Sequence, residues 1–121
     1  MKLRTFEQAK TLADAGATEI AGYTGGWTRR ISFEHRADGG VAARLFRTDV
    51  VTFYPDHFTV DLGGYVTMST FDGIAAALGV QRGTGSIGTV RKVPHVLGVP
   101  VDPNRPNTFS YNGELWTGFV R

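Results

Sequence analysis

The chain has 121 residues, of which 41% are hydrophobic and 20% are charged, and this ordinary globular usage excludes a disordered or fibrous protein. Cysteine is absent, which excludes disulfide frameworks, thiolate metal sites and thiol nucleophiles and favours a reducing compartment. The formal net charge of +2 fits an ordinary solvated surface. The first residues show no signal segment, and no apolar run approaches the roughly 18 residues that cross a bilayer. We therefore expect one cytoplasmic domain over residues 1–121 with no membrane partner.

The first predicted element is a short helix over residues 6–15. Thr5 and Gln8 form a capping-box pattern, and apolar residues recur at helical spacing up to Gly16. A helix of about three turns is marginal alone in water, so its apolar stripe must pack on something larger.

The larger partner is a predicted antiparallel sheet. A first strand is expected at 18–23, and beyond it apolar and polar residues alternate with the two-residue period of strands. Turn signals at Asp38-Gly39-Gly40 and Pro55-Asp56-His57 close two expected hairpins. The segments expected to form a four- or five-stranded meander are 27–36, 41–47, 50–54, 58–62 and 65–68.

A second short helix is predicted before Gly79. Ser69 or Thr70 can cap its start, and Asp72 is expected in its first turn, where the helix dipole favours a negative charge. Residues 81–107 hold four of the five prolines and several glycines, so this segment is predicted to be irregular within the same domain.

A C-terminal hairpin completes the predicted fold. Residues 108–111 and 114–120 flank Asn112-Gly113, the pair that a type I′ turn prefers. Together the elements predict an α+β fold, in which two short helices pack on one face of a small antiparallel sheet made of the meander and this hairpin.

The polar face of the first hairpin is the main candidate binding surface. Alternation places Arg30, Arg36 and Arg44 on this face together with Phe46. Arginine beside an exposed aromatic ring is typical of a platform for single-stranded nucleic acid. Two other interpretations stay open. The face can be an ordinary charged surface, because Glu34 shares it, and Phe46 can be a core residue, because a register shift of one residue would turn its side chain inward.

Exposed aromatic residues are the second set of candidates. Trp27 and Tyr65 lie near predicted turns, where aromatic side chains often mark binding patches. Tyr111 and Trp116 flank the last turn and fit equally well as a cross-strand pair that stabilises the hairpin.

A glycine-rich run matches the G-x-G-x-x-G pattern at Gly83, Gly85 and Gly88. A dinucleotide site of this kind needs a strand before the run and a helix after it, and the sequence predicts neither. The motif is therefore a weak candidate phosphate loop beside the simpler interpretation of a flexible loop.

Neither the histidines nor the acidic residues form a recognisable catalytic or metal-binding pattern. His35, His57 and His95 are far apart in the sequence and lack the spacing of paired helical ligands. Asp49, Asp56, Asp61 and Asp72 each have a local explanation in a bend, a turn, a strand face or a helix start. We expect no cofactor and no metal, and the sequence favours binding over catalysis.

One part of the chain resembles a known group of proteins. Residues 44–56 read Arg-Leu-Phe-Arg-Thr-Asp-Val-Val-Thr-Phe-Tyr-Pro-Asp, and residues 59–67 read Thr-Val-Asp-Leu-Gly-Gly-Tyr-Val-Thr. This resembles short uncharacterised proteins of actinobacterial phages and prophages, in which an R-L-x-x-T-D-V-V strand meets a T-L-x-x-G-G-W-x-T strand. The resemblance covers residues 41–75, with Tyr65 at the usual Trp position and His57-Phe58 at the usual turn glycine.

The resemblance implies a phage source and carries no catalytic residue. It favours an accessory protein in the host cytoplasm that binds a host macromolecule without catalysis, as an inhibitor or modulator. A protein that binds or sequesters nucleic acid or a nucleotide is the alternative, and a small hydrolase is a third. The partner is thus a host protein or a nucleic acid, and an open sheet edge would also allow a homodimer.

Overall fold

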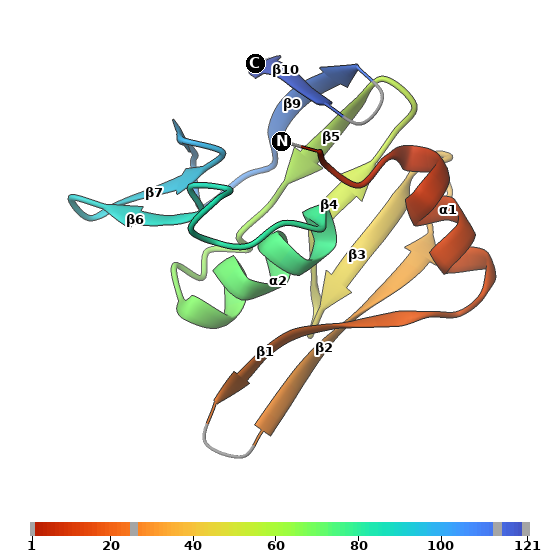
Figure 1. The fold of residues 1–121 in the computed structure, drawn as a ribbon, viewed down its shortest axis with the longest axis horizontal. Coiled ribbons are helices and arrows are strands. Elements are labelled where there is room, and N and C mark those ends of the chain that lie inside the picture. Colours follow the sequence, from red (N-terminus) through yellow and green to blue (C-terminus); the bar gives the residue numbers. More distant parts are fainter. Residues whose placement is uncertain (1, 25–26, 113–114, 120–121) are drawn as a thin grey trace.

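The computed structural model describes residues 2–24, 27–112 and 115–119, and it describes only the backbone at 22–24, 27–28, 111–112 and 115–119. Figure 1 shows the arrangement of the elements. In chain order they are α1 (Phe6–Asp14), β1 (Thr18–Thr24), β2 (Trp27–His35), β3 (Val41–Leu45), β4 (Thr48–Phe53), β5 (His57–Val60), α2 (Met68–Leu78), β6 (Gly88–Val90), β7 (Val93–Val96), β8 (Val99–Pro100), β9 (Asn107–Asn112) and β10 (Leu115–Phe119).

The main sheet confirms the predicted antiparallel architecture. In the described chain it has seven strands in the order β1-β2-β3-β4-β5-β9-β10, and every neighbouring pair is antiparallel. The meander thus runs from β1 to β5, and the C-terminal hairpin joins it beside β5. The pairing of Asn112 with Leu115 places Asn112 in β9 and not in the predicted turn, and Gly113 lies outside the described residues.

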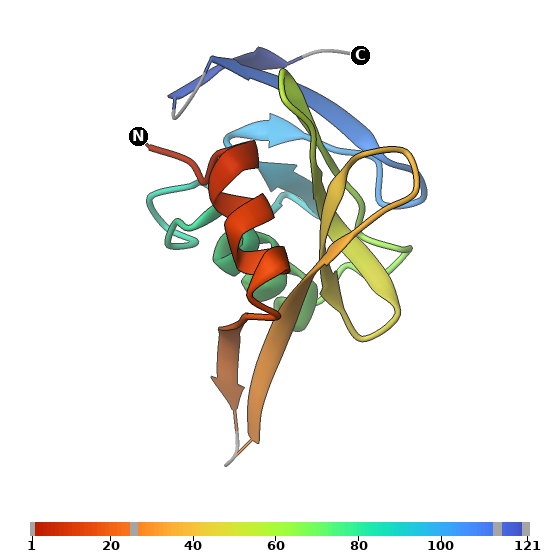
Figure 2. The ribbon, with the colours of Figure 1, turned by 90° about the vertical axis from the view of Figure 1, so that its right-hand side faces the viewer.

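Two short helices pack on the same side of this sheet, as the sequence predicted (Figure 2). The capping box of α1 forms as expected, because the Thr5 side chain accepts from the Gln8 N–H and the Gln8 side chain accepts from the Thr5 N–H. Helix α2 is the more deeply buried helix and contacts β1 to β4. It ends at Gly79, whose φ of 74° is the left-handed conformation common just after a helix. Neither described helix has the length and apolar character that a membrane span requires.

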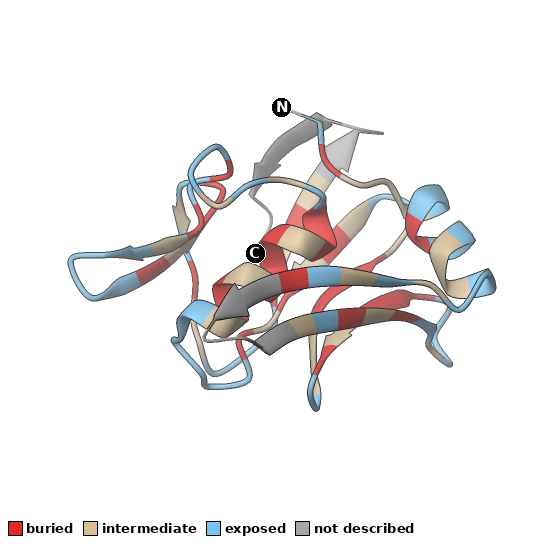
Figure 3. Ribbon diagram, turned by 60° about the horizontal axis from the view of Figure 1, so that its bottom comes forward, coloured by how far each residue is buried: buried red, intermediate tan, exposed pale blue. Residues whose placement is uncertain are grey.

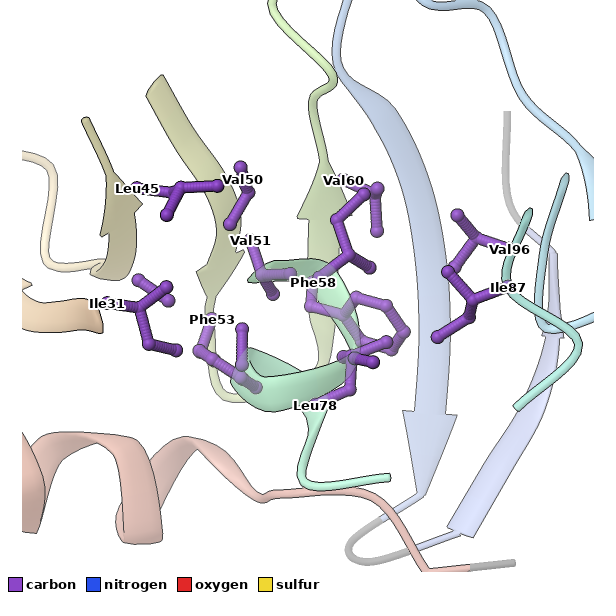
Figure 4. Close-up of a cluster of buried hydrophobic side chains, with 14 of the residues drawn as sticks. Ile31, Leu45, Val50, Val51, Phe53, Phe58, Val60, Leu78, Ile87 and Val96 are labelled. Carbon is purple, nitrogen blue, oxygen red and sulfur yellow. The ribbon is translucent and has the colours of Figure 1, made fainter. Parts of the chain in front are cut away.

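The core lies between the helices and the inward face of the sheet (Figures 3 and 4). Neighbouring strands place phenylalanines side by side, and the rings of Phe58 and Phe109 stack with their centroids 5.2 Å apart. The ring of Phe53 is tilted against that of Phe58 at 6.4 Å. Full burial of such side chains contributes roughly 1.5–3 kcal/mol each, so this cluster is a major source of stability. The largest fully buried side chains are Phe53, Phe58, Phe109, Ile31, Leu62, Ile74, Leu78, Val41, Val50, Val51, Val60 and Val96.

A register shift between β3 and β4 determines which side chains meet on the outer face. Ala43 lies opposite Val51, but its neighbour Arg44 lies opposite Asp49, so Val50 is the extra residue of a β-bulge. Both valines remain buried, and Asp49 is brought directly across from an arginine.

Arg4 joins the start of the chain to the end of α2. Its Nε donates to the Ala77 carbonyl at 2.9 Å and its Nη2 to the Ala76 carbonyl at 3.3 Å, where helix carbonyls have no partner within the helix. The guanidinium also lies over the Phe33 ring, 5.1 Å from the centroid. Burial lowers the pKa of Arg4, and Glu19 at 3.7 Å partly offsets that effect.

Three predictions about the second half of the chain were wrong. Residues 65–68 form no strand, because Thr67 caps α2 and the helix begins at Met68. Asp72 is consequently past the first helical turn and instead meets Arg82. Segment 81–107 is not irregular throughout, since it contains the three-stranded sheet β6-β7-β8 and buries Ile87, Val96, Leu97 and Val101.

Replacing Arg4 with Met should destabilise the protein by about 1–3 kcal/mol, because a similar stem would remain while charged hydrogen bonds to two helix carbonyls are lost. Urea denaturation followed by circular dichroism measures the difference. The exposed Lys10→Met variant is the control and should change stability by less than about 0.5 kcal/mol. Equal stability of the Arg4→Met variant and the wild type would contradict this role.

Candidate functional site

The arginines predicted to form a binding face are largely engaged with an acidic partner. Arg36 binds Asp49 through two parallel hydrogen bonds of 2.8 and 2.7 Å, and Arg44 approaches the same carboxylate at 3.5 Å. The hydrogen bonds from Arg36 hold the pKa of Asp49 below its usual value and raise the pKa of Arg36. A second carboxylate, that of Glu34, lies 3.6 Å from Arg36. The face therefore presents paired charges instead of a positive patch.

The remaining candidates of that face are separated from this cluster. Arg30 is exposed on β2, nearer the start of the strand than Glu34 and the ion pair of Arg36 with Asp49. Phe46 is not on the face at all, because it occupies the turn after β3 with a φ of 55°. The side chain of Trp27 lies outside the described residues.

Phe46 and Tyr65 instead border one apolar hollow of about 400 Å³ between the β3–β4 turn and the start of α2. Its volume is within the range of small binding sites. The residues that line it are Leu45, Phe46, Arg47, Thr48, Val50, Tyr65, Thr67, Ser69 and Thr70. We call this site the α2 hollow. Sequence reasoning proposed the two aromatic residues but missed the α2 residues, because it expected a strand where the helix begins.

Large apolar side chains around the α2 hollow are unusually exposed. Phe46, Tyr65 and Met68 expose 72%, 64% and 69% of their surface, and Val66 lies between the last two. A bulky residue in the left-handed region is unfavourable by about 1–3 kcal/mol, so Phe46 is held in a strained position in which its ring faces solvent. Exposed apolar groups that surround a hollow are typical of an interaction site.

The loop beside the α2 hollow is anchored by a buried amide. The Asn107 side chain donates to the carbonyls of Val60, Asp102 and Arg105 and accepts from the Asp102 N–H. The Pro103 carbonyl in turn accepts from the Gly64 N–H, next to Tyr65. These hydrogen bonds fix the position of the loop next to Tyr65, at the edge of the α2 hollow.

The glycine-rich run does not have the form of a phosphate loop. The N–H groups of Gly85 and Ser86 donate to the carbonyls of Gln81 and Gly83, so they are occupied within the turn. A Cβ on Gly85 would lie 2.9 Å from Val80 and 3.0 Å from Ile87, which explains the absence of a side chain there by packing. The run leads into strand β6 and not into a helix.

Two of the described histidines each contact one aspartate. His35 Nε2 lies 2.6 Å from Asp14, and His57 Nδ1 lies 2.6 Å from its neighbour Asp56. The His57 ring also stacks on Tyr54 at 4.5 Å. Tyr54 donates to Asp38 at 2.7 Å, which raises the pKa of the tyrosine to about 12. No group of three His, Asp or Glu side chains placed to hold a metal occurs among the described residues.

Comparisons of the chain with protein-family models, with curated proteins and with solved structures find no match.

Replacing Asp49 with Asn should cost about 1 kcal/mol near neutral pH, because the Arg36 pair is direct but roughly a quarter exposed. The folded pKa of Asp49 is lowered, so its carboxylate stabilises the fold above the ordinary value of 3.8 and loses that effect as the pH falls through the lowered value. The stability difference between wild type and Asp49→Asn, measured in urea, should therefore shrink in acid. A stability difference that stays constant as the pH falls would contradict the assignment.

Proposed function

We propose that this protein is a non-catalytic binding protein that receives an apolar anchor of a host protein in the α2 hollow. The observation that carries the proposal is the exposure of Phe46 and Tyr65, which both line the hollow, with Phe46 in a strained backbone conformation. Aromatic residues at the centre of a contact surface supply most of the energy in many protein interfaces.

A protein partner explains the surroundings of the hollow better than a small molecule does. A small molecule inside it would leave the exposed Val66 and Met68 side chains in water, whereas a protein surface would cover them. The cationic side chain on the lining is that of Arg47, which is exposed and has no ion pair in the described structure. The partner segment is therefore expected to carry an acidic residue next to its apolar anchor.

The alternative of nucleic-acid binding on the sheet is less well supported, because Asp49 engages both Arg36 and Arg44. Nucleotide binding at the glycine run is also less well supported, since its turn uses the donors that a phosphate would need. The phage source and the cytoplasmic host compartment stay predictions of the sequence resemblance.

A Phe46→Gly variant separates binding from stability. Glycine tolerates the positive φ, so the variant should be as stable as the wild type or up to about 1 kcal/mol more stable, while its affinity for the partner should fall at least tenfold. Immobilised protein is used to capture host proteins from an actinobacterial lysate, and the affinity of a captured protein is then measured by calorimetry.

Val93→Ser is the matched control, because it also shortens an exposed apolar residue but lies on β7. A protein held by wild type and Val93→Ser and lost from Phe46→Gly supports the proposal. Capture of the same proteins by Phe46→Gly, or capture of none by the wild type, overturns it.

A further inference from the structure

The positive charge of the protein is concentrated in one lobe. Residues 80–107 contain four basic side chains, those of Arg82, Arg91, Lys92 and Arg105, and one acidic side chain, that of Asp102. These residues therefore carry a formal net charge of +3, while the whole chain carries +2. The rest of the chain is slightly acidic, so the lobe is the part that an anionic partner would approach.

Two of these cations form the tip of a projecting two-stranded ribbon (Figures 1 and 3). Strands β6 and β7 pair as far as Val90 and Val93, which leaves Arg91 and Lys92 as the two residues of the turn. Their φ angles are 51° and 68°, a left-handed pair for which Asn-Gly is the usual choice. The chain thus has two cations where turn geometry favours small residues.

These tip cations differ from the arginines of the main sheet in having no partner. Neither Arg91 nor Lys92 makes a side-chain hydrogen bond or ion pair with the part of the chain that the structure describes, and both are exposed. By contrast, Arg36 and Arg44 share Asp49. Unpaired cations at a fixed, projecting position can contact phosphates without first breaking an internal ion pair.

A second feature of this lobe is a hollow along the ribbon that contains several polar side chains. This shallow hollow of about 620 Å³ is lined by Arg82, Ser86, Thr89 and His95 among others. The Nδ1 of His95 donates to the Val93 carbonyl at 2.9 Å, which holds the ring against the ribbon. All three residues of β6 line this hollow as well, so it runs along the ribbon as far as Val90, the residue before Arg91.

We propose that the β6–β7 ribbon binds duplex DNA through its phosphate backbone, with Arg91 and Lys92 as the main contacts. A two-stranded ribbon has the width that the major groove admits. The ribbon has no Phe, Tyr or Trp on which unpaired bases could stack, and its one imidazole, that of His95, is half-buried and bound to the Val93 carbonyl, which argues against single strands as the preferred partner. Its exposed apolar residues are only Val90 and Val93, too small a set for insertion into a membrane. This surface is separate from the α2 hollow, so either proposal can fail without the other.

The test uses the preference of this two-residue turn for Asn-Gly. In the double variant Arg91→Asn with Lys92→Gly, the ribbon keeps a favoured turn while losing two charges, so a loss of binding would not reflect unfolding. Binding to a labelled 20-base-pair duplex is measured by fluorescence anisotropy at several salt concentrations. The control is Lys10→Gln with Arg30→Gln, which removes the same charge from two exposed positions elsewhere.

The ribbon variant is expected to bind at least tenfold more weakly at low salt, and the slope of log K against log salt should become less negative by about 1.8, since each phosphate contact contributes about 0.9. The control should change the slope by less than half as much. Equal loss in both double variants would show a general charge effect and overturn the proposal. Tighter binding to a single strand of the same length, to heparin or to phosphatidylserine vesicles would also overturn it, as would no binding by the wild type.

Discussion

The burial of α2 against the main sheet is the constraint on which both proposed surfaces depend. Phe71, Ile74 and Leu78 fill the space between the helix and the strands, and Arg4 ties the last carbonyls of the helix to the start of the chain. The first turn of the helix forms one wall of the α2 hollow, and the chain that leaves its last turn builds the lobe with the basic ribbon. A displacement of this helix along the sheet would therefore alter both surfaces together.

The charges of the protein fall into two physically different groups. On the outer face of the sheet, the bulge between β3 and β4 places Asp49 where it serves both Arg36 and Arg44, so the charges there satisfy one another. On the ribbon, Arg91 and Lys92 are exposed at the turn and meet no carboxylate in the described chain. An ion-paired group must give up its partner before it binds another, and an unpaired group in water need not.

Both surfaces share a second property, which is bulky residues in backbone conformations that favour glycine. Phe46, Arg91 and Lys92 all have φ between 50° and 70°, and each lies in a two-residue turn between paired strands. Short hairpins require such angles, but they do not require a large side chain there. The placement of a ring and of two cations at these turns is consistent with a role in binding, because strain that brings no packing benefit is more readily retained at functional positions.

The residues alone determined the fold class, the capping box of α1 and most strands of the meander, because these features depend on local propensity and two-residue alternation. They also indicated that Phe46 and Tyr65 are accessible. Only the tertiary structure showed that these two residues border the α2 hollow. The bulge at Val50, the start of α2 at Met68 and the pairing of β6 with β7 all depend on contacts between distant segments, so alternation could place the arginines on one face but could not show that Asp49 lies among them.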